Sequence, residues 1–214
     1  MNKKFLIPVI SLVVIVVIVV IVVIVGIFMI PVTEDKQSET LSVSYNDANK
    51  YLKSELSIHD ISMSSPLKLN GVSIEKYCTF FADTSVQNAI EYCTSTELLD
   101  SNGKYLGNIH IVGVNDSPKY AIGVIQADPQ ISQLDDIKTI YNIMIEYLVC
   151  DCWAAQKPGE FNSVSDWIDA ANTHHLEAKR ITSKSEINGL AQNDLLLEIT
   201  TNTEGYLWKF IIPT

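Results

Sequence analysis

The sequence predicts an α+β protein: an N-terminal transmembrane helix followed by one two-layer domain, in which helices cover an antiparallel sheet. Residues 5–30 contain no charged side chain, and the rest of the chain alternates between helical and strand periodicity. The strand-like segments form two groups of three with short connections, and strands connected in this way are antiparallel. A long helix between the groups must bury its apolar face against the sheet.

The apolar stretch is long enough to cross a bilayer. Residues 9–30 give 22 consecutive residues without a charge, and a bilayer core about 30 Å thick needs ~20 apolar residues in a helix. Lys3 and Lys4 precede the stretch, so the positive-inside rule places the N-terminus in the cytoplasm and the C-terminal domain outside the cell membrane. The stretch exceeds the ~7–15 apolar residues of a signal peptide. We therefore expect residues 1–31 to form an uncleaved, single-pass signal anchor.

The part that follows the anchor is acidic. Residues 32–43 are polar and lack aromatic side chains, which is typical of a linker, and residues 44–214 are long enough for one extracytoplasmic domain with its own core. All 25 acidic residues follow the anchor, against 13 of the 15 basic ones, so this part carries a formal charge of −12. Nucleic acids and anionic lipid surfaces require clusters of positive charge. We therefore exclude a nucleic-acid partner, and the membrane contact is assigned to residues 9–30 alone.

The first part of the domain is predicted to be largely helical. Apolar residues at helical spacing indicate a helix over 44–57, and Pro and Asn-Gly breakers make 58–71 a loop. Residues 72–82 fit a strand or a helix, and we favour a helix. Residues 85–93 form a further helix that places Cys93 on its apolar face.

Two groups of three strands follow, separated by two helices. Asn102-Gly103 marks a hairpin turn in the first group, and Asn188-Gly189 separates two strands of the second. The first helix spans 132–149, with Ser132 and Asp135 as its capping pair, and the second begins at the pair Ser163 and Asp166 and runs to about residue 177. The strands are predicted at 96–99, 105–114, 120–127, 179–187, 194–201 and 206–212.

Four cysteines lie in the domain: Cys78, Cys93, Cys150 and Cys152. An even number outside the cytoplasm indicates disulfides. A direct Cys150–Cys152 bond would close a very small ring, whereas bonds from these two to Cys78 and Cys93 would staple distant segments, each worth ~3–4 kcal/mol. The pairing stays open. In the alternative interpretation, all four thiolates bind zinc or copper(I), or a pair of them is redox-active.

No motif identifies a catalytic residue. The chain lacks a nucleophile elbow, a phosphate-binding loop, a dinucleotide fingerprint and a His-Glu-x-x-His pattern. The four histidines, His59, His110, His174 and His175, are expected to be ordinary surface or hydrogen-bonded residues, with His110 on the wet side of a strand. A hydrolase would require a pocket that gathers His110 or His174 with two acids. Asn115-Asp116-Ser117 is a sequon in a predicted turn, so Asn115 is a possible glycosylation site.

Four segments carry a resemblance to a known group. They are Ile74–Cys78, Tyr92-Cys93-Thr94-Ser95, Gly107-Asn108-Ile109-His110 and Val149-Cys150-Asp151-Cys152-Trp153. Together with the Val/Ile-rich anchor, this arrangement resembles uncharacterised membrane-anchored exported proteins of ammonia-oxidising archaea, over most of residues 72–212. The resemblance implies an archaeal cell-surface location. It implies no activity and transfers no functional residue.

These observations favour a membrane-anchored, non-catalytic binding or interaction module with no cofactor, whose protein or small-molecule partner the sequence does not identify. Such a module is expected to have no buried polar cluster and to use an exposed sheet face or groove for contact. The alternative is a metal-binding or thiol-redox domain that uses the four cysteines. An enzyme is the least supported of the three.

Overall fold

The computed structural model describes residues 43–214, which belong to one compact unit. The predicted anchor over residues 1–31 and all but the last residue of the predicted linker lie outside the described residues. Within the described part, no helix has both the length and the apolar composition needed to cross a membrane.

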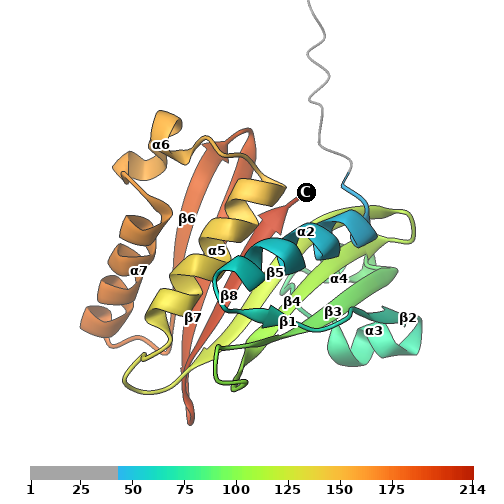
Figure 1. The fold of residues 1–214 in the computed structure, drawn as a ribbon, viewed down its shortest axis with the longest axis horizontal. Helices are drawn as coiled ribbons and strands as arrows, with labels where there is room; N and C mark the ends of the chain where they lie inside the picture. Colours follow the sequence, from blue (N-terminus) through green and yellow to red (C-terminus); the bar gives the residue numbers. More distant parts are fainter. Residues whose placement is uncertain (1–42) are drawn as a thin grey trace, which may run out of the picture. The chain divides into compact units, whose positions relative to one another are not determined.

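A single antiparallel sheet of eight strands organises the described residues (Figure 1). The strand order is β1-β3-β4-β5-β8-β7-β6, and β2 pairs with β3 next to β1. The two predicted groups of strands meet where β5 pairs with β8. The strands are β1 (Ser62–Met63), β2 (Leu67–Asn70), β3 (Tyr92–Leu99), β4 (Tyr105–Val114), β5 (Ser117–Ala127), β6 (Thr182–Leu190), β7 (Asn193–Asn202) and β8 (Gly205–Pro213).

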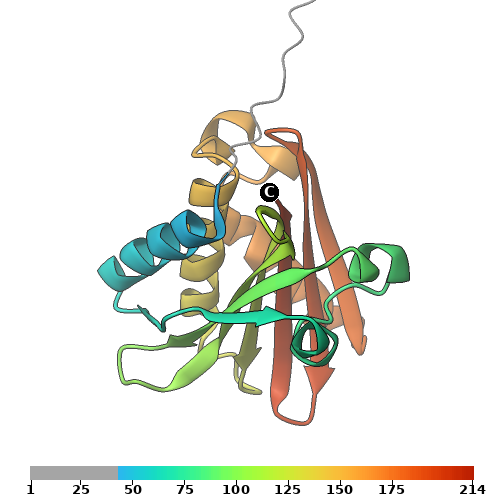
Figure 2. The same ribbon diagram turned by 90° about the vertical axis from the view of Figure 1, so that its right-hand side faces the viewer.

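Three helices cover one face of the sheet and form the main core (Figures 1 and 2). They are α2 (Tyr45–Ile58), α5 (Leu134–Leu148) and α7 (Val164–Ala178). Two short elements, α6 (Trp153–Gln156) and the 3-10 helix η1 (Pro158–Glu160), connect α5 to α7. Trp167 of α7 and Trp208 of β8 are fully buried in this core, as is Tyr141 of α5. The predicted α+β class and the antiparallel sheet packed against helices are confirmed.

The opposite face of the sheet is partly covered by α3 (Val72–Tyr77) and α4 (Thr84–Asn88), as Figure 2 shows. Beneath them is a second, smaller core that includes Ile74, Cys78, Cys93 and Val112. The expected two-layer arrangement is therefore incomplete, because the segment before β3 adds a partial third layer. The helices of this layer, α3 and α4, are too short to show an apolar periodicity that would predict the layer.

The helix predicted over 85–93 is largely wrong. Helix α4 ends at Asn88, and Cys93 lies in β3. Alternation explains the difference, since Thr94 and Thr96 face the main core while Cys93 faces the smaller one, and β3 is paired along its whole length with β4. The predicted loop 58–71 likewise contains β1 and β2, which pair with β3.

Helix starts were predicted with mixed success. The Ser163 hydroxyl accepts a hydrogen bond from the Asp166 amide at 3.0 Å, so the predicted cap of α7 is confirmed. The predicted capping pair of α5 is wrong, because that helix begins after Gln133 without a side-chain cap. The Ser132 hydroxyl instead hydrogen-bonds the Asp128 carboxylate.

Candidate functional site

The four cysteines form two local pairs. Cys78 bonds to Cys93, with 6.6 Å between their Cα atoms, and Cys150 bonds to Cys152, with 5.2 Å between theirs. The prediction of disulfides is confirmed, and of the pairings left open the structure has the one that includes the direct Cys150–Cys152 bond with its very small ring. The first pair lies in the smaller core and the second packs against the main core, on the other side of the sheet. A four-thiolate site is therefore not assembled.

The Cys78–Cys93 pair is completely buried. Cys78 ends α3, where its amide donates a 2.9 Å hydrogen bond to the Ile74 carbonyl, and Cys93 is the second residue of β3. Both residues are 0 % exposed. The apolar side chains of Ile74, Ile90 and Val112 belong to the same core, so the disulfide ties the outer layer directly to the sheet.

Gln87 of α4 holds the segment that carries Cys78. Its side-chain oxygen accepts hydrogen bonds from the amides of Phe80 at 2.9 Å and Phe81 at 3.2 Å, and its side-chain nitrogen donates to the Cys78 carbonyl at 2.9 Å. From the other side, the Lys209 ammonium donates to the Phe80 carbonyl at 3.5 Å. These four hydrogen bonds fix the segment independently of the disulfide.

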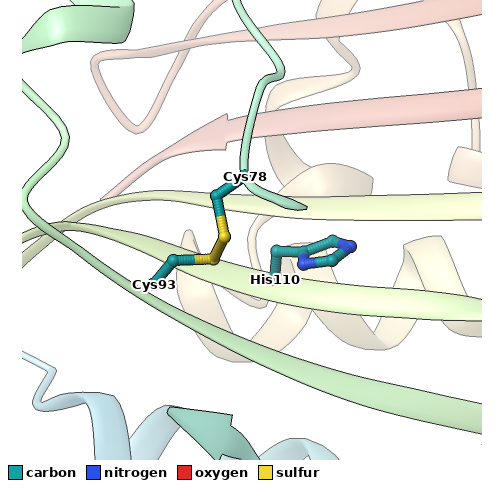
Figure 3. A group of neighbouring side chains, drawn as sticks. All are labelled: Cys78, Cys93 and His110. Atoms are coloured by element: carbon teal, nitrogen blue, oxygen red, sulfur yellow. A yellow bond between two sulfur atoms is a disulfide. The ribbon is translucent and has the colours of Figure 1, made fainter. Parts of the chain in front are cut away.

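His110 lies beside this disulfide (Figure 3). It stands on β4, and its ring packs against Phe80 at a centroid distance of 4.6 Å. The residue is only 8 % exposed, and its Nδ1 is buried without a hydrogen-bond partner among the described residues. Burial lowers the pKa of His110 to about 4. The expected wet-side position is therefore wrong, because the loop after α3 covers this part of the strand.

Together, Cys78, Cys93 and His110 present three potential metal ligands. One atom from each residue lies within 4.8 Å of the others, and all three residues are buried. While the sulfurs are bonded to each other, no thiolate is present to bind a metal. The chemistry open to this group is thus reduction of the disulfide, followed by coordination.

An open pocket of about 650 Å³ adjoins the same layer. Ile74 and Ile90, which pack with the disulfide, form part of its wall, and so does Thr79, the residue after Cys78. Glu75 and Glu91 bring two carboxylates to its lining. This pocket brings solvent to the outer wall of the smaller core, although neither cysteine of the disulfide lines it.

A second polar group lies on the helix-covered face and was not predicted. His175 of α7 is 2 % exposed, and its ring nitrogens are 2.8 Å from the Ser183 hydroxyl and 2.9 Å from the Thr201 hydroxyl. Burial, and secondarily the neighbouring His174, lower the pKa of His175. The expectation of no buried polar cluster is therefore wrong. Both ring nitrogens are paired, which suits a positioning role in the core, and no carboxylate among residues 43–214 hydrogen-bonds the ring.

The remaining predicted residues lie apart from these groups. Asn115 is exposed in the turn between β4 and β5, which is accessible to a glycosylating enzyme. His174 is exposed while His175 is buried, so these neighbours on α7 point apart. His59 is exposed at the end of α2.

Comparison with known proteins adds no relative: no family model, curated protein or solved structure matches the chain. The resemblance to exported archaeal proteins therefore stays a prediction, and function has to be argued from the residues themselves.

Proposed function

We propose that the chain is a non-catalytic interaction module, tethered outside the cytoplasmic membrane by residues 9–30, that binds a protein partner. Two disulfides support this placement, because disulfides form and persist in oxidising compartments outside the cytoplasm. The order of Lys3 and Lys4 before the apolar stretch supports the same orientation.

The contact surface that we propose is the part of the sheet that faces away from the main core on β8, β7 and β6, here called the open face. On β6 its residues are exposed, and on β7 and β8 they are half-buried. In the sheet register they stand opposite one another across the three strands. The open face consists of Thr182, Lys184, Glu186, Leu196, Glu198, Thr200, Leu207 and Lys209.

The observation that carries the proposal is that all the polar side chains of the open face except Glu186 are already paired with one another. The Glu198 carboxylate lies 2.8 Å from the Lys209 ammonium and 3.4 Å from that of Lys184. The hydroxyls of Thr182 and Thr200 are 3.1 Å apart. Ordering side chains on binding costs ~0.5–1.5 kcal/mol for each long one, and a surface ordered beforehand avoids much of that cost.

The charge of the open face favours a protein over other partners. Two lysines and two glutamates balance on it, although the whole chain has a formal charge of −10. Leu196 and Leu207 lie half-buried between these charges. Balanced charges around aliphatic side chains suit the mixed chemistry of a protein surface, whereas nucleic acids and anionic lipids require net positive charge.

Site-specific photocrosslinking tests this proposal in the full chain in its own membrane. A photoreactive residue replaces Lys184 or Thr200 on the open face, and the control replaces Lys53, an exposed residue of α2. We expect a discrete adduct of one mass from both open-face positions and none from the control. The charge-swapped variant Glu198→Lys with Lys209→Glu keeps an ion pair but changes the charge pattern, so the adduct should be lost.

An adduct that forms equally from position 53, or that survives the charge swap, would contradict binding through the open face. Failure to form any adduct from positions 184 and 200 would contradict it as well. Cooperative thermal unfolding of the charge-swapped variant serves as the control for folding. An ion pair is retained across β7 and β8, but the midpoint should fall slightly, because the swap removes the Lys209 donor to the Phe80 carbonyl and places a lysine beside Lys184.

A further inference from the structure

We propose that reduction of the Cys78–Cys93 disulfide creates a zinc-binding site whose protein ligands are Cys78, Cys93 and His110. This site lies on the same face of the sheet as the open face and borders it, because Lys209 donates a hydrogen bond to the Phe80 carbonyl, but none of its three ligands belongs to the open face. Among the described residues, it is the group whose donor atoms come within coordination reach of one another.

The donor atoms are close to the arrangement that zinc requires. Zinc–sulfur bonds are about 2.3 Å and zinc–nitrogen bonds about 2.0–2.1 Å, which places tetrahedral ligand atoms roughly 3.4–3.8 Å apart. The three ligand atoms already lie within 4.8 Å of one another. After reduction the sulfurs have only to separate to about 3.8 Å, a change that side-chain rotation supplies. The fourth position is left for water or a further ligand.

The site should keep its shape when the disulfide is opened. Cys93 and His110 stand on β3 and β4, which are paired along their length. Cys78 is held by hydrogen bonds from the Gln87 side chain to its carbonyl and from its own amide to the Ile74 carbonyl, neither of which involves sulfur. Ligands that remain in place after reduction lose less freedom on binding the metal, so they bind it more tightly.

Charge and hydrogen bonding favour a divalent cation. Two thiolates and one neutral imidazole balance the charge of Zn²⁺, and a neutral complex is the least costly to bury. Nδ1 of His110 has no hydrogen-bond partner among the described residues, although it is buried. An unpaired buried polar atom costs ~1–3 kcal/mol, and coordination through this nitrogen would satisfy it.

The chemical steps balance with one dithiol reductant. A thiolate of the reductant attacks one sulfur of the protein disulfide, the S–S bond breaks and a mixed disulfide forms. The second thiol of the reductant resolves this intermediate and becomes part of a new disulfide. The protein gains two electrons and two protons as two thiols. Zinc then displaces the two thiol protons to solvent and bonds both sulfurs and the imidazole.

The adjoining pocket supplies an approach for both reactants. It is about 650 Å³ and open, and its wall includes Ile74 and Thr79 on either side of the Cys78 segment. Glu75 and Glu91 place two carboxylates in the lining, which attract a cation before it reaches the sulfurs. Because the cysteines themselves are 0 % exposed, reduction requires a local opening of this layer.

The test uses the full chain in detergent with Cys150→Ala and Cys152→Ala, so that one disulfide remains. A phosphine, which carries no thiol to bind metal, reduces it, and Zn²⁺ is titrated in competition with a colorimetric chelator. We expect one equivalent bound by the reduced chain and none by the oxidised chain. His110→Phe keeps an aromatic ring of similar size but removes the ligand, and should weaken affinity by at least ~10–100-fold.

Absence of stoichiometric zinc binding after reduction, or equal affinity in the His110→Phe variant, would overturn the proposal. Because the His110→Phe variant could fail to fold, a second measurement uses only the wild-type chain. In the reduced wild-type chain, zinc should protect Cys78 and Cys93 from maleimide alkylation while Cys150 and Cys152 still react. Equal protection of all four cysteines, or protection of none, would also overturn it, and neither result would affect the crosslinking test of the open face.

Discussion

The two disulfides should differ in their contribution to stability, and the chain provides its own matched comparison. One variant carries Cys78→Ala with Cys93→Ala, and the other carries Cys150→Ala with Cys152→Ala. Each loses two sulfurs and one bond. The bonds close loops of very different size, since the sequence separation is 15 for the first pair and 2 for the second.

The expected magnitudes follow from loop closure. In the chain-entropy model, a disulfide stabilises the fold by restricting the unfolded chain, by about 3 kcal/mol for a loop of ~15 residues and roughly 1 kcal/mol for one of two. Cys78 and Cys93 also join the outer layer to the sheet, and both are fully buried. We therefore expect the first variant to lose about 2 kcal/mol more than the second.

Urea unfolding followed by tryptophan fluorescence measures the difference, because Trp167 and Trp208 are fully buried and will report loss of the main core. At ~2–4 °C per kcal/mol for a domain of this size, the first variant should also unfold ~4–8 °C below the second. Equal losses, or a larger loss from the Cys150/Cys152 variant, would refute the loop-length reasoning and the role assigned to the outer layer.

Three further substitutions test a packing contact, a hydrogen bond and an ion pair of the sheet, and the free energy of unfolding is measured for each. A Cβ on Gly123 would lie 2.8 Å from the ring of Tyr141, so Gly123→Ala should destabilise by ~1–3 kcal/mol through overpacking; an unchanged midpoint would contradict this. The Tyr141 hydroxyl donates to the Trp208 carbonyl at 3.1 Å, so Tyr141→Phe should cost about 1 kcal/mol, and a gain would count against it. Burial raises the pKa of Glu198, but the hydrogen bond and charge of Lys209 lower it overall. The difference in free energy of unfolding between the wild type and Glu198→Gln should therefore be complete above the unfolded carboxyl pKa and should vanish as the pH falls through the lower folded pKa. A difference that persists in acid would contradict this.

Two Asn-Gly pairs show how far the sequence predicts this fold. Asn102-Gly103 lies in the predicted hairpin turn, where the Asp100 carboxylate accepts hydrogen bonds at 2.8 Å from the amides of Asn102 and Lys104. All the residues that make this turn are neighbours in the sequence. Local chemistry was therefore sufficient to predict it.

Asn188-Gly189 is the same dipeptide, but it does not form the turn between its two strands. Gly189 has φ +77° and lies in an irregular part of β6, and the chain turns two residues later at Ala191 and Gln192, both with positive φ. Strand pairing decides this, because Leu190 pairs with Asn193 across the turn. Register is a property of both strands, so the dipeptide alone could not reveal it.

The candidate zinc site was only half predictable. The sequence pointed to cysteines in disulfides, and it placed His110 correctly on a strand. It did not show that Phe80, thirty residues earlier, covers that histidine, or that Gln87 fixes the covering segment. The contact of Phe80 with His110 joins segments distant in sequence, and the nearer Gln87 contacts depend on the short helices α3 and α4, which have too few turns to show an apolar period.

How the cysteines are paired is the most direct test, because the proposed location of the domain in an oxidising compartment outside the cytoplasm and the proposed zinc site both depend on the two disulfides. Trypsin cuts after Lys76 and Lys104, so Cys78 and Cys93 share one peptide, while Cys150 and Cys152 share another that begins after Lys138. For chain made in an oxidising compartment and digested without reductant, we expect two separate peptides, each lighter than its reduced form by two hydrogens. A single species in which the two peptides are joined would contradict the account, and so would free thiols on either peptide.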